Sequence, residues 1–275
     1  MLKTTIKNKD FFFFDSEDLV IDYLKKGGLY GEPNFKLLDK YVLDKDATVV
    51  DCGGHIGTFS FSAASEGRKL IVVEGAERNA QCLQETFKEF NNVDVEHAIL
   101  LDDVSKCDFS SDYGPFGSAK QNNNGSSTSQ TLDNIVERLN PVKVSAIKYD
   151  LEGNEISALN GSLKTLNKYK PVLLIEINGF ALMEQDKKPY HIFSLLEELG
   201  YNYWLPNGSS LLCIDKYSKY PFCISDILCI HKDNMGLYKD LSIIPAMNGS
   251  QIYKTYAANY ASSNDVCRKY FNYIK

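Results

Sequence analysis

An aspartate followed by two spaced glycines closes the apolar run at residues 48–50. Asp51, Gly53 and Gly57 fit the pattern Asp-x-Gly-x-x-x-Gly, and the residues after Gly57 have helical apolar spacing. A strand, tight turn and helix start of this kind brings backbone N–H groups and the positive end of a helix to a ligand. Glycine allows the close approach because it has no Cβ. These residues predict a nucleotide-type pocket. A dinucleotide pattern would need glycine at position 52, where the chain has Cys52, so the dinucleotide interpretation is weaker.

A carboxylate also ends the next apolar run, residues 70–74. Glu74 follows Asp51 by 23 positions. At about this register, an acid at the end of a second strand accepts hydrogen bonds from both ribose hydroxyls of an adenosine. The run is apolar without interruption, as expected for a strand that helices cover on both faces. We therefore expect Glu74 and the glycine turn to lie on one rim of a mostly parallel sheet.

A second group of ionisable residues ends a later apolar run. Alternation along a strand points Lys148 and Asp150 to the same side and Tyr149 to the other. In an open α/β sheet the carboxyl ends of the strands border the ligand crevice, so this pair is a candidate for the reacting site. Glu176 and Asn178 end the following strand and would lie next to Asp150 if the two strands are neighbours.

The elements that must position these residues alternate between strands and helices, which is typical of an α/β sheet. Strands are predicted at residues 48–52, 70–74, 93–101, 144–150 and 171–177. Helices are predicted at residues 56–64, 79–90, 132–139 and 191–199. We expect Thr131 to cap the helix at 132–139. Residues 210–215 and 226–231 are expected to pair with each other as a hairpin.

The chain is expected to form a single domain with three parts. A helical lead-in occupies residues 1–46, the core occupies residues 47–232, and a helical extension occupies residues 233–275. Within the core, residues 102–131 lose the apolar pattern to Asp, Ser, Gly and Asn. A loop this long inside a compact domain is typically a lid, a specificity insertion or a disordered excursion.

Composition limits the classes of partner. Of the 275 residues, 44% are hydrophobic and 24% are charged, which are ordinary globular values. The formal net charge of −6 disfavours nucleic acid, because binding to phosphate backbones needs a surplus of Lys and Arg. The apolar run at residues 11–14 is too short for a signal-peptide core or a membrane span. Seven cysteines without a Cys-x-x-Cys pair predict buried thiols in a reducing compartment, so we expect a cytoplasmic protein.

With both groups of residues in place, the sequence resembles the FkbM family of S-adenosylmethionine-dependent methyltransferases over residues 18–232. The resemblance is carried by Val-Asp-Cys-Gly-Gly-His-Ile-Gly at residues 50–57, Val-Glu-Gly at 73–75, Thr-Leu-Asp at 131–133, Ile-Lys-Tyr-Asp-Leu-Glu-Gly-Asn-Glu at 147–155, Gly161 and residues 171–176, with Tyr30, Glu32 and Pro33 upstream. Three positions differ from the family pattern. His55 stands where the family usually has Asn, Gly54 where Ala is common, and Gly75 where Pro usually follows the acid.

The resemblance implies the seven-stranded, Rossmann-like sheet of class I methyltransferases, in the order 3-2-1-4-5-7-6 with helices on both faces. It also implies S-adenosylmethionine as cofactor and O-methylation of a hydroxyl on a sugar, a polyketide or another small natural product. The glycine turn would then hold the methionine part of the cofactor, Glu74 the ribose, and residues 97–98 the adenine edge. The cofactor-binding residues expected on this basis are Glu32, Asp51, Gly53, Gly54, His55, Gly57, Glu74, His97 and Ala98.

The same resemblance gives the ionisable residues their expected roles. Methyl transfer from a sulfonium is an in-line displacement, which needs a group that orients the acceptor and takes its proton. Asp150 is the first candidate, and the alternative is a carboxylate satisfied by nearby N–H groups. Lys148 could support Asp150 or neutralise a substrate charge, and could equally form a structural ion pair. A further alternative is Mg²⁺ held by Asp150, Glu176 and Asn178.

Two other functions stay open from the sequence. An NAD-dependent Rossmann-type oxidoreductase would explain a glycine turn but not the run at residues 147–155. A non-catalytic adaptor that retained the methyltransferase fold would not depend on Asp150.

Overall fold

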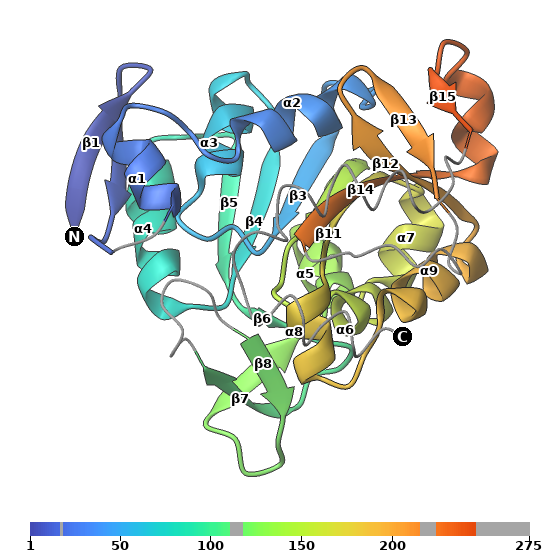
Figure 1. Ribbon diagram of the computed structural model, residues 1–275. Helices are drawn as coiled ribbons and strands as arrows, with labels where there is room; N and C mark the ends of the chain where they lie inside the picture. Colours follow the sequence, from blue (N-terminus) through green and yellow to red (C-terminus); the bar gives the residue numbers. More distant parts are fainter. Residues whose placement is uncertain (17–18, 111–117, 215–223, 246–275) are drawn as a thin grey trace, which may run out of the picture. The chain divides into compact units, whose positions relative to one another are not determined.

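The computed structural model of the protein describes residues 1–16, 19–110, 118–214 and 224–245. The chain divides into two compact units, residues 1–172 and 173–275, and each unit has its own group of strands (Figure 1). The single domain predicted from the sequence, with boundaries near residues 46 and 232, stays a prediction. In the described part of the chain, no helix is both long and apolar enough to cross a bilayer.

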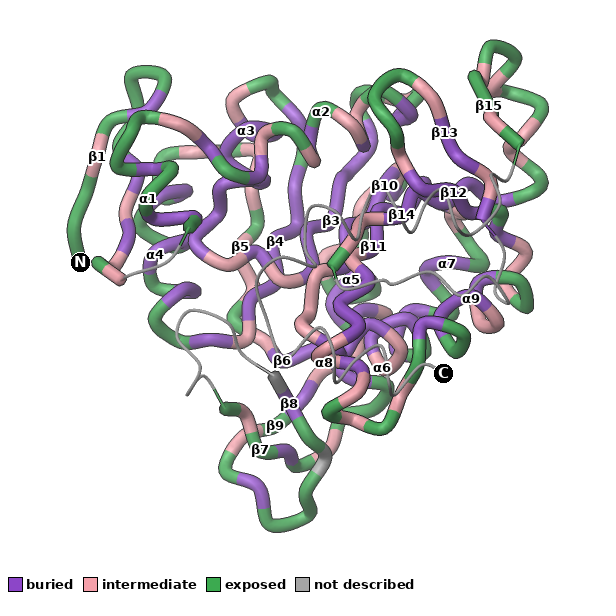
Figure 2. Tube along the Cα trace, in the orientation of Figure 1, coloured by how far each residue is buried: buried purple, intermediate pink, exposed green. Residues whose placement is uncertain are grey.

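Four parallel strands form the centre of the first unit. They are β3 (Thr48–Cys52), β4 (Leu70–Glu74), β5 (Val93–His97) and β10 (Val144–Tyr149). Their order is β5-β4-β3-β10, and every neighbouring pair is parallel. All residues of β3 and β4 are buried, and these strands are purple in Figure 2. The α/β fold predicted from the sequence is confirmed in this form.

Helices connect these strands and cover the sheet. They are α3 (Thr58–Ser65), α4 (Glu77–Phe87), α5 (Leu132–Leu139), α6 (Glu155–Asn160) and α7 (Leu163–Tyr169). Right-handed crossovers put α3 and α4 on one face and α5 and α7 on the other. In agreement, α3 and α4 both pack on β4, whereas α7 packs on β10 and against α5. The Thr131 hydroxyl accepts a hydrogen bond from the Asn134 N–H at 3.1 Å, which confirms the predicted cap of α5.

The first 46 residues differ from the predicted helical lead-in, because they begin with a hairpin. They hold β1 (Leu2–Ile6), β2 (Lys9–Phe13), α1 (Leu19–Lys25) and α2 (Glu32–Lys40). β1 and β2 pair antiparallel across Lys7 and Asn8, which are left-handed with φ of 48° and 63°. Two such residues form the type I′ turn that suits the twist of paired strands. Phe11 then packs edge-on against Phe61 of α3, with ring centroids 5.1 Å apart, and this contact fixes the hairpin to the core.

A small second sheet replaces the loop predicted at residues 102–131; we call it the insertion sheet. Its strands are β6 (Ile99–Leu100), β9 (Ser127–Gln130), β7 (Lys106–Ser110) and β8 (Ser118–Gln121), in that spatial order. The predicted third strand at residues 93–101 is therefore too long. It ends at His97, and Ile99 pairs with Ser129 of β9 instead. An apolar cluster stabilises the insertion sheet and consists of Ile99, Leu101, Cys107 and Ala119, with Phe109 packed against it.

The strands of the second unit are mostly antiparallel. They are β11 (Val172–Asn178), which begins at the boundary, β14 (Ile224–His231), β12 (Tyr201–Asn207), β13 (Ser210–Cys213) and β15 (Ile243–Ile244), in that spatial order. The helical elements are α8 (Gly179–Glu184), α9 (Pro189–Glu198) and the 3₁₀ helix η1 (Lys232–Leu237). The predicted pairing of residues 210–215 with 226–231 is wrong, since Trp204 of β12 lies between Cys213 and Leu228. A tight turn after Asn207 leads from β12 into β13, so β13 pairs with one edge of β12. The other edge of β12 pairs with β14.

Each unit carries one part of the strand order implied by the family resemblance. The order β5-β4-β3-β10 corresponds to 3-2-1-4, and the order β11-β14-β12 corresponds to 5-7-6. The complete seven-stranded order joins the two units and stays a prediction. Most of the predicted helical extension falls on residues 246–275, outside the described residues. Its described part holds the end of η1 and β15.

Candidate functional site

The turn after β3 can be built only with glycine at one key position. Gly53 is left-handed with φ of 86°, and a Cβ on it would lie 1.8 Å from the Asp150 carbonyl oxygen. The N–H groups of Gly53 and Gly54 both donate to the Val73 carbonyl, at 2.9 and 3.0 Å. Gly57, with φ of 94°, then precedes α3. The turn is thereby pressed between β4 and the end of β10, as the sequence pattern predicts for a close approach.

The Glu74 carboxylate joins this turn to the start of α4. One oxygen accepts the His55 N–H and the other accepts the Ala76 N–H, each at 2.7 Å. Glu74 is 8% exposed, and burial raises its pKa to about 7 even though hydrogen bonds from Ala76, His55 and Asn79 favour the charged form. We call this arrangement the Glu74 clamp. His55 has φ of 51°, and His shares with Asn a tolerance of left-handed backbone, which fits its place in the turn.

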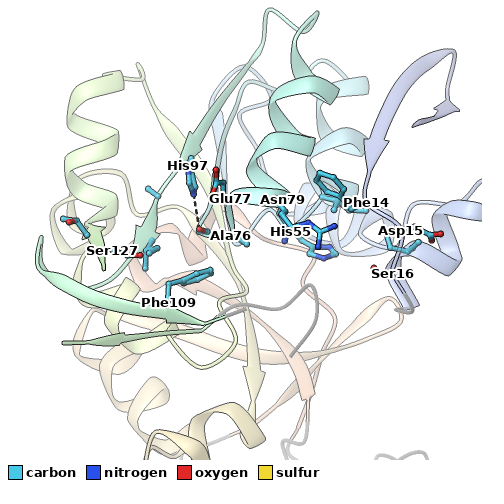
Figure 3. Close-up of a pocket in the computed structure, with 17 residues that line it drawn as sticks. Phe14, Asp15, Ser16, His55, Ala76, Glu77, Asn79, His97, Phe109 and Ser127 are labelled. Carbon is cyan, nitrogen blue, oxygen red and sulfur yellow. Dashed lines mark hydrogen bonds between the residues drawn. The ribbon is translucent and has the colours of Figure 1, made fainter. Parts of the chain in front are cut away.

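A cavity of about 710 Å³ opens beside the clamp (Figure 3). Small-molecule pockets usually measure roughly 300–1,000 Å³. The walls come from the N-terminal segment (residues 14–16 and Ile21), the glycine turn (His55, Ile56), the start of α4 (residues 75–79), the end of β5 (residues 97–99) and the insertion sheet (Phe109, Ser127, Thr128). This position, at the carboxyl ends of β4 and β5, is where open α/β sheets bind ligands.

Three of the predicted cofactor-binding residues line this cavity. His55 and Ala98 form parts of two walls, and His97 Nε2–H donates to the Gly75 carbonyl at 3.2 Å (Figure 3). Glu74 is not among the described lining residues, but it directly precedes Gly75, which is. Among the described lining residues, the other predicted positions do not occur: Glu32, Asp51, Gly53, Gly54 and Gly57. Their roles as cofactor contacts stay predictions.

Asp51 points into the protein rather than toward the cavity. It is 0% exposed, and Ser60 Oγ donates to its Oδ2 at 2.6 Å. Burial raises its pKa, whereas the charge of Lys148 acts in the opposite direction. Lys148 Nζ lies 3.7 Å from Asp51 Oδ1 and 2.8 Å from Asp150 Oδ2. The buried Lys148 ammonium group therefore forms ion pairs with both the buried Asp51 carboxylate and the partly exposed Asp150 carboxylate.

Glu32 takes part in ion pairs at the start of α2. Its Oε1 lies 3.1 Å from Lys36 Nζ and 3.4 Å from Lys7 Nζ. The hydrogen bond from Lys36, followed by the charge of Lys7, lowers the pKa of Glu32. These contacts give the side chain a structural role between α2 and the turn of the N-terminal hairpin.

The loop after Asp150 is shaped by a second buried acid. Glu155 Oε1 accepts the N–H groups of Leu151 and Gly153, at 2.9 and 3.2 Å. Glu155 is 0% exposed, and burial raises its pKa to about 7. Between these residues, Glu152 is left-handed with φ of 50°. Glu155 thus holds the backbone in the conformation that follows the Lys148 and Asp150 pair.

The alternative magnesium site draws on both units. Asp150 belongs to the first unit, whereas Glu176 and Asn178 lie on β11 in the second. The Asn178 side-chain oxygen accepts the Ala181 N–H at 3.2 Å and so caps α8. This three-oxygen site stays a prediction.

Replacing Lys148 should expose the cost of the buried Asp51 carboxylate. We predict that Lys148→Met lowers the free energy of unfolding by about 3 kcal/mol, since it removes the cation beside a buried acid. Asp51→Asn in the same background should recover part of this loss, because no buried charge then remains. Lys143→Met, which breaks an exposed pair with Asp44, should change the free energy of unfolding far less, because water and salt screen exposed ion pairs. Urea denaturation of wild type and the three variants measures this, and equal losses in Lys148→Met and Lys143→Met would contradict it.

Glu155 should make stability depend on pH. Its folded pKa of about 7 lies above the unfolded value, so its stabilising contribution is full below about pH 4.5 and is lost as the pH rises through 7. Glu155→Gln cannot titrate. We predict that this variant gains about 2 kcal/mol relative to wild type between pH 5 and pH 8. Unfolding curves at both pH values test this against Glu137→Gln, an exposed control on α5. Parallel pH profiles for wild type and Glu155→Gln would show the interpretation to be wrong.

The comparisons with known proteins place this site in a family. Residues 51–203 match the family model of the methyltransferase FkbM domain. Among curated protein sequences, the chain has no significant match.

Solved structures with a similar fold are distant in sequence. The chain is similar to methyltransferase FkbM from Methylobacillus flagellatus, with 18% identity and a TM-score of 0.43, over 68% of this chain and 44% of that chain. It therefore spans less than half the length of that protein. It is also similar to precorrin-6y C5,15-methyltransferase from Geobacter metallireducens, with 14% identity and a TM-score of 0.42, over 73% and 86% of the two chains. A third similar structure is TYW2 from M. jannaschii in complex with AdoMet, with 12% identity and a TM-score of 0.42, over 82% and 83%.

The family model covers more than half of the 275 residues. Its range contains the glycine turn, Glu74, and the pair formed by Lys148 and Asp150. The chain belongs to the FkbM methyltransferase family.

Proposed function

We propose that the protein is an S-adenosylmethionine-dependent O-methyltransferase that acts on a hydroxyl of a carbohydrate or a related small metabolite. The cavity beside the Glu74 clamp is the observation that carries this proposal. The acceptor class follows from the family resemblance alone. The predicted cytoplasmic location and the absence of a nucleic-acid partner stay predictions.

The walls of the cavity suit an adenosyl ligand. The His55 and Ala76 N–H groups and the Asn79 side chain donate to the Glu74 carboxylate, which leaves one of its roughly four acceptor sites for a ribose hydroxyl. Gly75 and Ala76, the two residues after Glu74, line the cavity, so we infer that the ribose would bind at this wall. Ala98 and Ile99 add an apolar wall at the end of β5. The combination of an apolar wall and a ribose-binding acid supports a nucleoside ligand.

Asp150 and Lys148 would act on the acceptor. S-adenosylmethionine would supply a methyl group made electrophilic by its sulfonium. The Asp150 carboxylate is 30% exposed, and its backbone N–H donates to the Cys52 carbonyl at 3.0 Å. This contact fixes Asp150 against the glycine turn, where it would orient a hydroxyl and accept its proton. The Lys148 ammonium, 2.8 Å away, would stabilise the carboxylate charge.

Calorimetric titration with S-adenosylhomocysteine and with NADH tests the cofactor. We expect S-adenosylhomocysteine to bind and NADH not to bind, because the turn has Cys52 where the dinucleotide pattern needs glycine. Binding of NADH alone would favour the oxidoreductase.

Incubation with S-adenosylmethionine and a panel of glycans and small hydroxyl compounds tests the reaction by mass spectrometry. A mass gain of one CH₂ group is expected on the acceptor.

Asp150→Asn should lower kcat by about 10²- to 10⁴-fold and leave the affinity for S-adenosylhomocysteine nearly unchanged. Asp46→Asn, an exposed control, should keep full activity. Loss of activity in excess EDTA would favour the magnesium alternative. Wild-type activity in Asp150→Asn would remove this residue from the mechanism.

A further inference from the structure

Phe109 of the insertion sheet lies directly against the turn that follows Glu74. A Cβ placed on Gly75 would be 3.1 Å from Phe109 Cε2 and 3.3 Å from its Cζ. The tip of the ring therefore occupies the space that a side chain at position 75 would need. The contact therefore depends on the glycine that this chain carries at position 75.

The Phe109 ring belongs to two environments at once. On one side it packs against the apolar cluster of the insertion sheet, which includes Ile99 and Cys107. It also lines the cavity beside the Glu74 clamp and remains partly exposed there. Figure 3 shows the ring near Ala76, with His55 and Phe14 on the far side of the cavity. Phe109 is thus an aromatic wall that is anchored from behind and open toward the ligand space.

The surroundings of this wall match the shape and polarity of a purine. A purine has flat apolar faces and a polar edge, so its faces stack on aromatic rings. Ile99 supplies further apolar surface, and the hydroxyl residues Ser127 and Thr128 of β9, the strand that pairs with β7, also line the cavity. A ribose held at Glu74 would direct its base along residues 97–99 and toward Phe109.

We propose that Phe109 stacks on the adenine of the adenosyl ligand and that Gly75 provides the space for this ring. The insertion sheet is then part of the cofactor site and determines its preference for adenine. This inference rests on the proposed function, because it assumes that an adenosyl ligand occupies the cavity.

Three variants test the stacking with S-adenosylhomocysteine as the probe. Phe109→Ala removes the ring, and its Kd should rise by about 5- to 100-fold, the range for loss of one base–aromatic stack. Phe109→Tyr keeps the ring and should bind like wild type. Gly75→Ala places a methyl group against the ring and should also weaken binding. Lys120→Ala, an exposed position on β8 of the same sheet, is the control and should leave Kd unchanged.

A spectroscopic readout separates stacking from a loss of structure. The ultraviolet absorption of adenine decreases on stacking, so a difference spectrum at saturating S-adenosylhomocysteine should show the decrease for wild type and Phe109→Tyr and lack it for Phe109→Ala. If the wild-type protein binds S-adenosylhomocysteine and Phe109→Ala has the same Kd and the same difference spectrum, the stacking is wrong. The proposed function would still stand in that case. Failure of the wild-type protein to bind S-adenosylhomocysteine would overturn both.

Discussion

The buried Glu74 carboxylate is the contact on which the site depends. It takes the N–H of His55 from the turn after β3 and the N–H of Ala76 from the turn before α4. Two loops that leave neighbouring parallel strands are thereby held at a fixed separation, and the cavity opens beside them. Burial of this acid is unfavourable to its charged form, and three hydrogen bonds offset the cost. The N–H groups of His55 and Ala76 need a hydrogen-bond acceptor, and the acid at the end of β4 supplies it.

The other side of the glycine turn is fixed by the end of β10. Gly53 has no space for a Cβ because the Asp150 carbonyl lies against it. Lys148 neutralises Asp150 and also serves the fully buried Asp51 one strand away. The aspartate before the glycine turn and the predicted catalytic acid therefore share one electrostatic network. The structural ion pair, one of the two roles considered for Lys148, is present, and its supporting role in catalysis stays a prediction.

Local signals in the sequence predicted the centre of the first unit, and non-local contacts decided what was missed. The apolar runs of β3 and β4, the glycine turn and the Thr131 cap each depend on residues close together in the chain. The N-terminal hairpin depends on Lys7 and Asn8 adopting left-handed backbone and on Phe11 reaching Phe61, 50 positions later. The insertion sheet depends on Ile99 pairing with β9 and on a small cluster around Cys107. In the insertion sheet, residues 106–110 alternate over only five positions, and the partner strands at 118–121 and 127–130 are almost without apolar residues, so the sequence does not predict their pairing. For the same reason, Phe109 was missed as a cavity residue.

A crystal structure of the protein with S-adenosylhomocysteine would show whether the Glu74 clamp and the cavity beside it bind an adenosyl group. We expect electron density for the adenosyl group in the cavity between residues 75–79, residues 97–99 and Phe109, with a ribose hydroxyl within hydrogen-bonding distance of the Glu74 carboxylate. Density for the ligand elsewhere on the chain, or a ribose with no contact to Glu74, would contradict it.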